Sequence, residues 1–202
     1  NYRWLLSQPS SYWLHKNCYA VGGVSSPRVE DVPVPEPATG ELLVRVGCAS
    51  LNPVDWKIAA GKFRFLVKGG LPRTMGSDFS GEIAAVGPGV EGWNVGERVM
   101  GFVDPFARAA GTFAEYVPVP AGFVMRRPME VDDALGAALP CVGLTAVALC
   151  NLAQVGRGSS VLVNGASGGV GHLAVQVAKA RGALVAATAS AGRREFVTAL
   201  GA

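Results

Sequence analysis

The strongest chemical signal in the chain is a run of small residues at positions 164–171, which read NGASGGVG. Within this run, Ala166, Gly168 and Gly171 keep an A-x-G-x-x-G spacing between an apolar stretch and a helical pattern. Glycines at this spacing let the main chain approach a pyrophosphate, and the N–H groups of the following helix attract its charge. An ordinary tight turn is the alternative, but the flanks favour a dinucleotide-binding turn. The candidate binding residues are Ala166, Ser167, Gly168, Gly169, Val170 and Gly171.

The segment about 20 residues further on bears on which dinucleotide is bound. Sites for NAD place an acid there to hold the ribose 2′-hydroxyl, whereas this chain has Ser190 and Arg193, with no acid before Glu195. Serine and arginine can hydrogen-bond a 2′-phosphate that an acid would repel. We therefore expect NADPH as the cofactor, the alternative being that Arg193 is a solvated helix residue.

A second glycine pattern has the wrong surroundings. Residues 87–92 read GPGVEG, a literal G-x-G-x-x-G, but the WNVG that follows cannot begin a helix. The pattern is typical of a hairpin or barrel turn.

The elements that must position these residues fall into two parts. Short strand-like segments separated by glycine and proline predict a β-rich barrel or sandwich for the first part, with one short helix at residues 53–60. The expected strands are residues 41–50, 78–86, 97–102 and 111–119.

After about residue 126 the pattern changes to alternating helices and apolar strands. Strands at 159–164 and 183–188 enclose a helix whose apolar residues recur at i, i+3, i+4, i+7 and i+8 from Val170. Such a βαβ unit predicts a parallel sheet buried on both faces. Further helices are expected at residues 131–139, 142–152 and 193–200.

Several segments together resemble the medium-chain dehydrogenase/reductase superfamily, and within it the zinc-independent quinone oxidoreductases and the alkenal or enone reductases. They are residues 32–37 (VPVPEP), 50–61 (SLNPVDWKIAAG), 76–101, 139–146 (LPCVGLTA) and 164–179. The resemblance implies an α/β protein with a GroES-like catalytic domain at 18–126, after an extension at 1–17. A partial Rossmann domain, the doubly wound parallel fold, would occupy residues 127–202.

The resemblance implies hydride transfer from NADPH to a small-molecule quinone or α,β-unsaturated carbonyl. Asn52 is the first candidate to stabilise the developing negative oxygen; Lys57 could contact cofactor or substrate, and Thr145 could line the nicotinamide. Each has a structural alternative: Asn52 as a helix N-cap, Lys57 as a solvated residue and Thr145 as a core hydroxyl.

The resemblance also predicts a site without zinc. Zinc-dependent relatives carry a cysteine in the segment matching residues 51–55 and a His-Glu pair in the segment matching 76–78. This chain has Asn52 and Pro53 in the first and Ser77 and Asp78 in the second. Zinc needs three or four converging ligands, so we expect no metal.

A complete Rossmann domain has more strands than the two predicted here. We therefore expect the 202-residue chain alone to bind NADPH weakly and to turn over little. The alternative function is a truncated, catalytically silent nucleotide-binding or interaction protein. The resemblance also allows a homodimer formed through Rossmann edge strands.

The composition excludes other classes of partner. Half of the residues are apolar, 16% are charged and the net charge is +3, which does not suit a nucleic-acid partner. The uncharged stretch 134–156 contains Pro140 and fits two buried helices better than a membrane span. The four cysteines form no close pairs and are expected as free thiols. We expect a cytoplasmic protein; the alternative is a chloroplast protein, because residues 1–29 are basic and lack acids.

Overall fold

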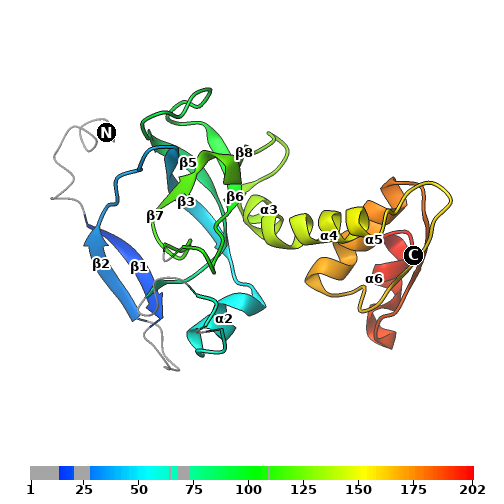
Figure 1. Ribbon diagram of the computed structural model, residues 1–202. Coiled ribbons are helices and arrows are strands. Elements are labelled where there is room, and N and C mark those ends of the chain that lie inside the picture. The colour runs from blue at the N-terminus through cyan, green and yellow to red at the C-terminus, as the bar shows by residue number, and fades with distance from the viewer. Residues whose placement is uncertain (1–13, 21–27, 64, 68–72, 109) are drawn as a thin grey trace. The chain divides into compact units, whose positions relative to one another are not determined.

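The computed structural model describes residues 14–20, 28–63, 65–67, 73–108 and 110–202. The chain forms two compact units, Asn1–Pro140 and Cys141–Ala202 (Figure 1). The first unit consists mainly of strands, and the second alternates strands and helices. The predicted α/β fold class with a β-rich N-terminal part is therefore confirmed.

The centre of the first unit is a five-stranded antiparallel sheet in the order β7-β3-β5-β6-β8. Its strands are β3 (Glu41–Ser50), β5 (Asp78–Val86), β6 (Arg98–Phe102), β7 (Tyr116–Pro120) and β8 (Val124–Arg126). Alternate apolar side chains of these strands form one core, since successive residues of a strand face opposite sides. That core contains Leu42, Val44, Phe79, Ile83, Val99, Val103, Val117, Val119 and Val124.

The predicted strands 41–50 and 78–86 have the bounds that the structure shows, and 97–102 differs by one residue. The strand predicted at 111–119 begins only at Tyr116. Its first part leaves the ladder because the N–H groups of Thr112 and Phe113 bond to the carbonyls of Gly76 and Met75. The glycine pattern at 87–92 is a turn between β5 and β6, as predicted.

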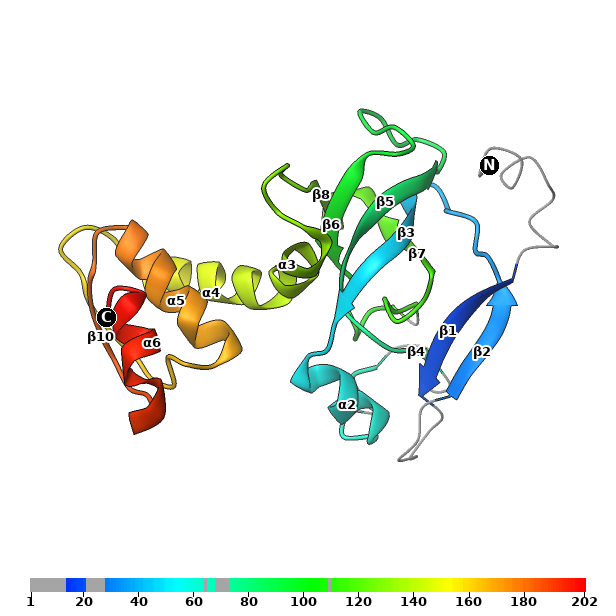
Figure 2. The same cartoon turned by 180° about the vertical axis from the view of Figure 1, so that it is seen from behind.

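A second sheet, in the order β2-β1-β4, was not predicted from the sequence. It contains β1 (Leu14–Ala20), β2 (Arg28–Pro33) and β4 (Arg73–Thr74), and Figure 2 shows β1 and β2 side by side. β1 crosses residue 17, where the N-terminal extension was expected to end. The sequence signal for β4 is weak because this strand has two residues and pairs with β1 across more than 50 positions.

The second unit is built around a two-stranded parallel sheet, β9 (Ser160–Val163) and β10 (Leu184–Ala187), joined through α5 (Gly169–Ala180). The predicted βαβ unit is confirmed, with Ala174, Val175 and Ala178 of α5 buried. The expected burial of both sheet faces is wrong for the described chain: Leu162 and Leu184 are 67% and 71% exposed. α5 packs against both strands, and the face that carries these two leucines is exposed among the described residues of the second unit.

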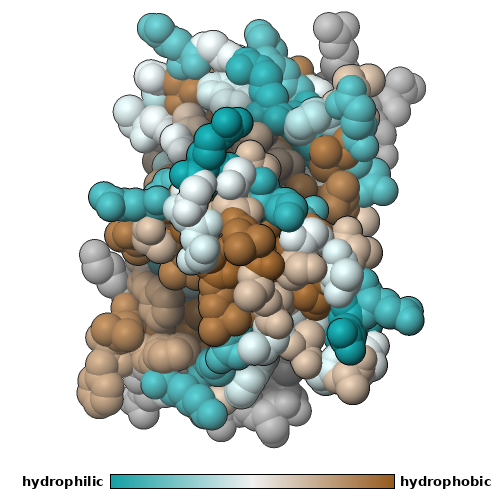
Figure 3. Space-filling model, turned by 90° about the vertical axis from the view of Figure 1, so that its right-hand side faces the viewer, coloured by the Kyte–Doolittle hydropathy of each residue, from teal (hydrophilic) through white to brown (hydrophobic). Residues whose placement is uncertain are grey.

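Helix α4 (Pro140–Leu152) opens the second unit, and η3 (Ala191–Arg193) and α6 (Arg194–Ala199) close it. The predicted break at Pro140 is confirmed, since α3 (Asp133–Ala138) ends before it. Within the described residues, no helix has the length and apolar character needed to cross a membrane. The expectation that α4 is buried is wrong, since its residues Leu144 and Leu152 are 61% and 83% exposed. Figure 3 shows brown apolar side chains gathered on the face that it draws.

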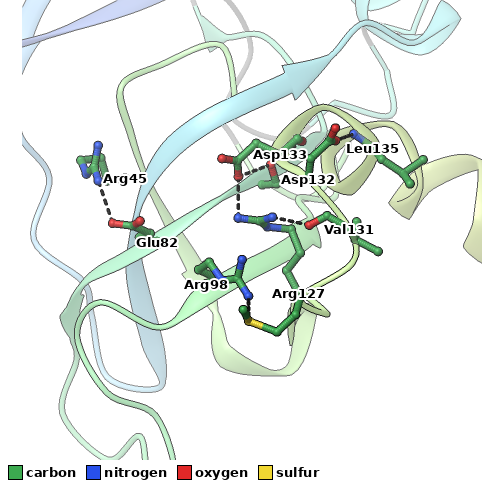
Figure 4. A network of polar contacts seen from close by, with 10 residues as sticks. Arg45, Glu82, Arg98, Arg127, Val131, Asp132, Asp133 and Leu135 are labelled. Atoms are coloured by element: carbon green, nitrogen blue, oxygen red, sulfur yellow. Dashed lines mark hydrogen bonds and ion pairs between the residues drawn. The ribbon is translucent and has the colours of Figure 1, made fainter.

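The boundary between the units lies 14 positions after the predicted residue 126, because α3 packs on β3, β5 and β6 of the first unit. Arg127, buried beside this helix, forms an ion pair with Asp133 at 3.1 Å and donates to the carbonyl of Val131 (Figure 4). Ser80 Oγ of β5 donates to the Asp133 carboxylate at 3.0 Å. These contacts place α3 in the first unit.

Candidate functional site

The glycine-rich turn connects β9 to α5. Gly165 has φ +71°, a left-handed conformation that glycine adopts without strain, and its carbonyl accepts a bond from Gly168 N at 3.0 Å. Gly168 is the N-cap of α5, and its carbonyl accepts the N–H of His172 at 3.0 Å. The N–H groups before His172, in the first turn of the helix, have no intrahelical acceptor. They form a concentration of donors suited to an anion.

Gly171 must be glycine for the turn to close. A Cβ at this position would lie 2.4 Å from the carbonyl oxygen of Gly165 and 2.8 Å from Cα of Ala166, both main-chain atoms. Ala166, in the first place of the motif, is fully buried in the core of the second unit. The helix therefore approaches the end of β9 closely, as a dinucleotide-binding turn requires. Ser167 lies in the same turn, and Gly169 and Val170 begin α5.

The two residues expected to distinguish the cofactors follow the carboxyl end of β10. Ser190 is the N-cap of η3, and its carbonyl accepts the N–H of Arg193 at 2.9 Å. Both residues are exposed. The structure therefore brings Ser190 and Arg193 together at the strand end where a ribose is bound in this fold; the alternative of a solvated Arg193 stays open.

Sequence reasoning did not find Thr188, which joins the two strand ends. Its Oγ1 accepts from Gly165 N at 3.0 Å and donates to Asn164 Oδ1 at 2.5 Å. Its carbonyl accepts from Ala166 N at 2.9 Å. A threonine directly after an apolar strand, opposite a glycine-rich turn, was the only available signal.

In the first unit, Asn52 lies between the end of β3 and the start of α2 (Pro53–Ala59), where it is the N-cap. It is 7% exposed. Its Nδ2 donates to Asp78 Oδ2 at 2.7 Å and makes a 3.4 Å contact with Ser50 Oγ, which itself donates to Asp78 at 2.9 Å. Asn52 therefore occupies the N-cap position of α2, and its side chain is held by a carboxylate from β5.

A second buried carboxylate holds the main chain of Asn52. Asp55 Oδ2 accepts the N–H of Asn52 at 2.7 Å, and Asp55 Oδ1 accepts Ser77 Oγ at 3.1 Å. Burial raises the pKa of Asp55 above its ordinary value, although the hydrogen bonds from Asn52 and Ser77 oppose that shift. Asp55 and Asp78 are 3% and 0% exposed. The group formed by Ser50, Asn52, Asp55, Ser77 and Asp78 is called the Asn52 cluster below.

The structure gives the other two candidates different surroundings. Lys57 is half-buried one turn along α2, with Nζ 5.6 Å from the ring centre of the exposed Trp56; Nζ of Lys62 lies 5.4 Å from the same ring. Thr145 is exposed on α4, and its Oγ1 donates to the carbonyl of Cys141 at 2.7 Å. The alternative of a core hydroxyl is therefore wrong for Thr145.

Among the residues that the structure describes, no three histidine, cysteine or acidic side chains converge as a metal site would require. Ring nitrogen Nδ1 of His172 lies 2.9 Å from the carbonyl of Gly168, within its own helix. Cys48 and Cys150 are free thiols.

Comparison with known proteins places the chain in a family. Residues 38–129 match the alcohol dehydrogenase GroES-like domain. The chain is 40% identical, over 94% of its length, to a chloroplast envelope quinone oxidoreductase homolog of Arabidopsis thaliana, and 38% identical over 90% to a chloroplastic quinone-oxidoreductase homolog of Spinacia oleracea. It spans 58% and 56% of those relatives.

The solved structures that resemble this chain belong to the same kinds of protein as its sequence relatives. The quinone oxidoreductase of Coxiella burnetii superposes with a TM-score of 0.87 at 36% identity, covering 94% of this chain and 61% of that one. An alcohol dehydrogenase superfamily protein of Novosphingobium aromaticivorans gives 0.88 at 35% identity, covering 93% and 57%. The chain belongs to the medium-chain dehydrogenase/reductase superfamily. Its first unit contains the GroES-like domain, and its second unit contains the first strands of the Rossmann fold.

Proposed function

We propose that this chain provides the catalytic domain and part of the cofactor domain of an NADPH-dependent oxidoreductase that reduces a quinone or an α,β-unsaturated carbonyl. The names of its relatives support the reaction: two are quinone oxidoreductase homologs, and one, 37% identical, is the NADPH-dependent alkenal/one oxidoreductase of Arabidopsis thaliana. The chain spans about half of these relatives, 48% for the last. The catalytic domain corresponds to the expected 18–126 extended by α3, and the cofactor domain to the second unit.

The observation that carries this proposal is the turn at 164–171, where Gly171 packs on the main chain of Gly165 and Ala166. Because Gly171 has no Cβ, the helix can approach the end of the strand as closely as a dinucleotide site requires. The bound cofactor would supply the hydride. Ala166, Ser167, Gly168, Gly169, Val170 and Gly171 would surround its pyrophosphate, with the N–H groups at the start of α5 as donors.

Ser190 and Arg193 would hold the 2′-phosphate of NADPH, because a hydroxyl and a guanidinium donate to phosphate oxygens. Glu195 lies in the first turn of α6 rather than at the strand end, so no carboxylate occupies the position that selects NAD. Thr145 on α4 would line the nicotinamide.

On the catalytic side, Asn52 and Lys57 would act on the reacting oxygen. Asn52 Nδ2 carries two N–H groups. One donates to Asp78 at 2.7 Å, and the contact with Ser50, at 3.4 Å, is near the limit of a hydrogen bond. We assign that second N–H to the substrate oxygen, where a donor stabilises developing negative charge. Lys57 would contact cofactor or substrate, and the site would work without zinc.

Binding of NADPH and NADH to the purified chain by isothermal titration calorimetry tests the cofactor assignment. NADPH should bind more tightly than NADH, and Arg193→Gln should weaken NADPH about tenfold while leaving NADH unchanged. Arg157→Gln, an exposed arginine outside this segment, is the matched control. Tighter binding of NADH by the unaltered chain contradicts the assignment of Ser190 and Arg193.

An assay of NADPH oxidation with a quinone and with an enone tests the reaction. Asn52→Ala and Lys57→Met should lower turnover with either substrate, whereas Lys179→Met, an exposed lysine on α5, should not. The alternative of a catalytically silent protein is supported if NADPH binds but is not oxidised with either substrate. This result should hold both for the chain alone and for a longer parent.

We propose a chloroplast location, because the relatives from Arabidopsis thaliana and Spinacia oleracea described above carry chloroplast names. A fluorescent fusion of the chain in leaf cells tests this, and a cytosolic signal favours the cytoplasmic alternative. Sedimentation of the purified chain tests the homodimer.

A further inference from the structure

Thr188 makes four hydrogen bonds to four consecutive residues of the opposite strand end. Its N–H donates to the carbonyl of Val163 at 3.0 Å, and its carbonyl accepts the N–H of Ala166 at 2.9 Å. Its hydroxyl accepts the N–H of Gly165 at 3.0 Å and donates to Asn164 Oδ1 at 2.5 Å. A hydroxyl has one donor and two acceptor positions, so this arrangement uses its single hydrogen.

The contact of the Thr188 hydroxyl with Gly165 lies at the start of a chain of contacts through the turn. The carbonyl of Gly165 accepts Gly168 N at 3.0 Å, and it is the atom that a Cβ on Gly171 would approach to 2.4 Å. Gly165 has a φ of +71°, a conformation that residues other than glycine rarely adopt. The hydroxyl therefore holds the peptide N–H before Gly165. The Thr188 carbonyl holds the N–H of Ala166, which shares a peptide with the Gly165 oxygen that sets the start of α5. Together the two bonds fix Gly165 from both sides.

We infer that Thr188 is a positioning residue for the pyrophosphate turn, holding Gly165 so that the N–H groups at the start of α5 converge on the cofactor. This inference rests on the proposed binding of NADPH. Thr188 acts through the main chain of the turn, so its hydroxyl supports the pyrophosphate, which NADPH and NADH share. Ser190 and Arg193, two and five positions further along, act on the 2′-phosphate that only NADPH carries.

The main-chain bonds of Thr188 survive any substitution that keeps the strand, so the side chain can be tested separately. Thr188→Val keeps the shape and removes both hydroxyl bonds, whereas Thr188→Ser keeps a hydroxyl. Because Thr188 and Gly165 are exposed, water can satisfy the released N–H and the cost in stability is small. The loss should appear in cofactor binding.

Isothermal titration calorimetry should show Thr188→Val binding both NADPH and NADH about tenfold more weakly, with their ratio preserved, because the turn loses the two hydroxyl bonds that hold it. Thr188→Ser should bind like the unaltered chain. Thr198→Val, the same substitution at an exposed threonine of α6, is the matched control. Unchanged binding of both nucleotides by Thr188→Val overturns the inference, and so does a loss confined to NADPH.

Amide hydrogen exchange without cofactor provides an independent measurement. Thr188→Val should speed exchange of the Gly165 amide about tenfold and that of Gly168 as well, while amides of the first unit keep their rates. Unchanged exchange at Gly165 overturns the inference even where binding is weak. An unaltered chain that binds neither nucleotide overturns the proposed function and, with it, the role assigned to Thr188.

Discussion

The Asn52 cluster and the glycine-rich turn place polar groups for function in opposite ways. Asn52 and Asp78 are 7% and 0% exposed, and two carboxylates hold the main chain and the side chain of Asn52. The turn at 164–171 contains no charged residue, and most of it lies at the surface. The Asn52 cluster depends on buried carboxylates whose hydrogen bonds offset the cost of burying them. The glycine-rich turn depends on the shape of its backbone.

This difference determines what each region tolerates. A buried polar group that loses its partner keeps the full cost of its desolvation, so the Asn52 cluster should be sensitive to the removal of an acceptor and to pH. A glycine turn loses its function when any atom occupies the space of a missing Cβ, so it should be sensitive to size and insensitive to pH.

The largest effect is expected for Asp78→Ala. This change leaves Asn52 Nδ2 and Ser50 Oγ without their buried acceptor, and the free energy of unfolding of the first unit should fall by about 3 kcal/mol. Urea unfolding followed by tryptophan and tyrosine fluorescence measures it, because every tryptophan and tyrosine precedes residue 141. Glu91→Ala in the exposed turn after β5 is the control. Equal effects of the two changes would contradict the importance of the buried acceptor.

Gly171→Ala should have a slightly smaller effect, and in the other unit. The added Cβ meets main-chain atoms that cannot rotate away, so the second unit should lose about 2 kcal/mol and the chain should lose NADPH binding. Loss of helical circular dichroism in urea reports mainly on this unit, because α4, α5 and α6 contain most of the helical residues. The fluorescence transition of the first unit should stay in place. Gly192→Ala, where a Cβ meets nothing within 4 Å, should unfold as the unaltered chain does.

The pH dependence should distinguish the two regions through Asp55. Its pKa is raised in the folded state, so its favourable contribution is complete below its unfolded pKa of about 3.9 and is lost as the pH rises through the folded value. Asp55→Asn has no such loss. The stability of the variant relative to the unaltered chain should therefore rise between pH 4 and pH 8, measured by urea unfolding with fluorescence detection. The opposite trend would show that the hydrogen bonds outweigh burial.

The smallest effect is expected for an exposed charge on the same sheet. Arg45 and Glu82 form an ion pair at 2.7 Å with side chains 47% and 45% exposed (Figure 4). Glu82→Gln should change the stability of the first unit by less than about 0.5 kcal/mol, because solvent screens such pairs. A loss of stability comparable with that of Asp78→Ala would mean that burial does not explain the different importance of the two carboxylates.

Local patterns predicted the elements whose signals are local. β3 and β5 have the predicted bounds because turn residues mark both ends of an alternating segment. The turn at 164–171 was found because its glycines, strand and helix are contiguous. Strand β4 was missed because it has two residues and pairs with β1 across more than 50 positions. The residues that support the site were missed for the same reason: Asp78 is 26 positions from Asn52, and Thr188 is 23 from Gly165.

The sequence by itself determined the superfamily, the alternation of strands and helices, and the residues of the glycine-rich turn, because each depends on neighbours along the chain. The tertiary structure decided which groups hold those residues. The pairing of β3 with β5 places Ser50 opposite Asp78, and thereby sets a carboxylate beside Asn52. The parallel pairing of Ala187 with Val163 brings Thr188 to Gly165. Strand register is a long-range property set by packing of whole sheets, so only the folded chain reveals these partners.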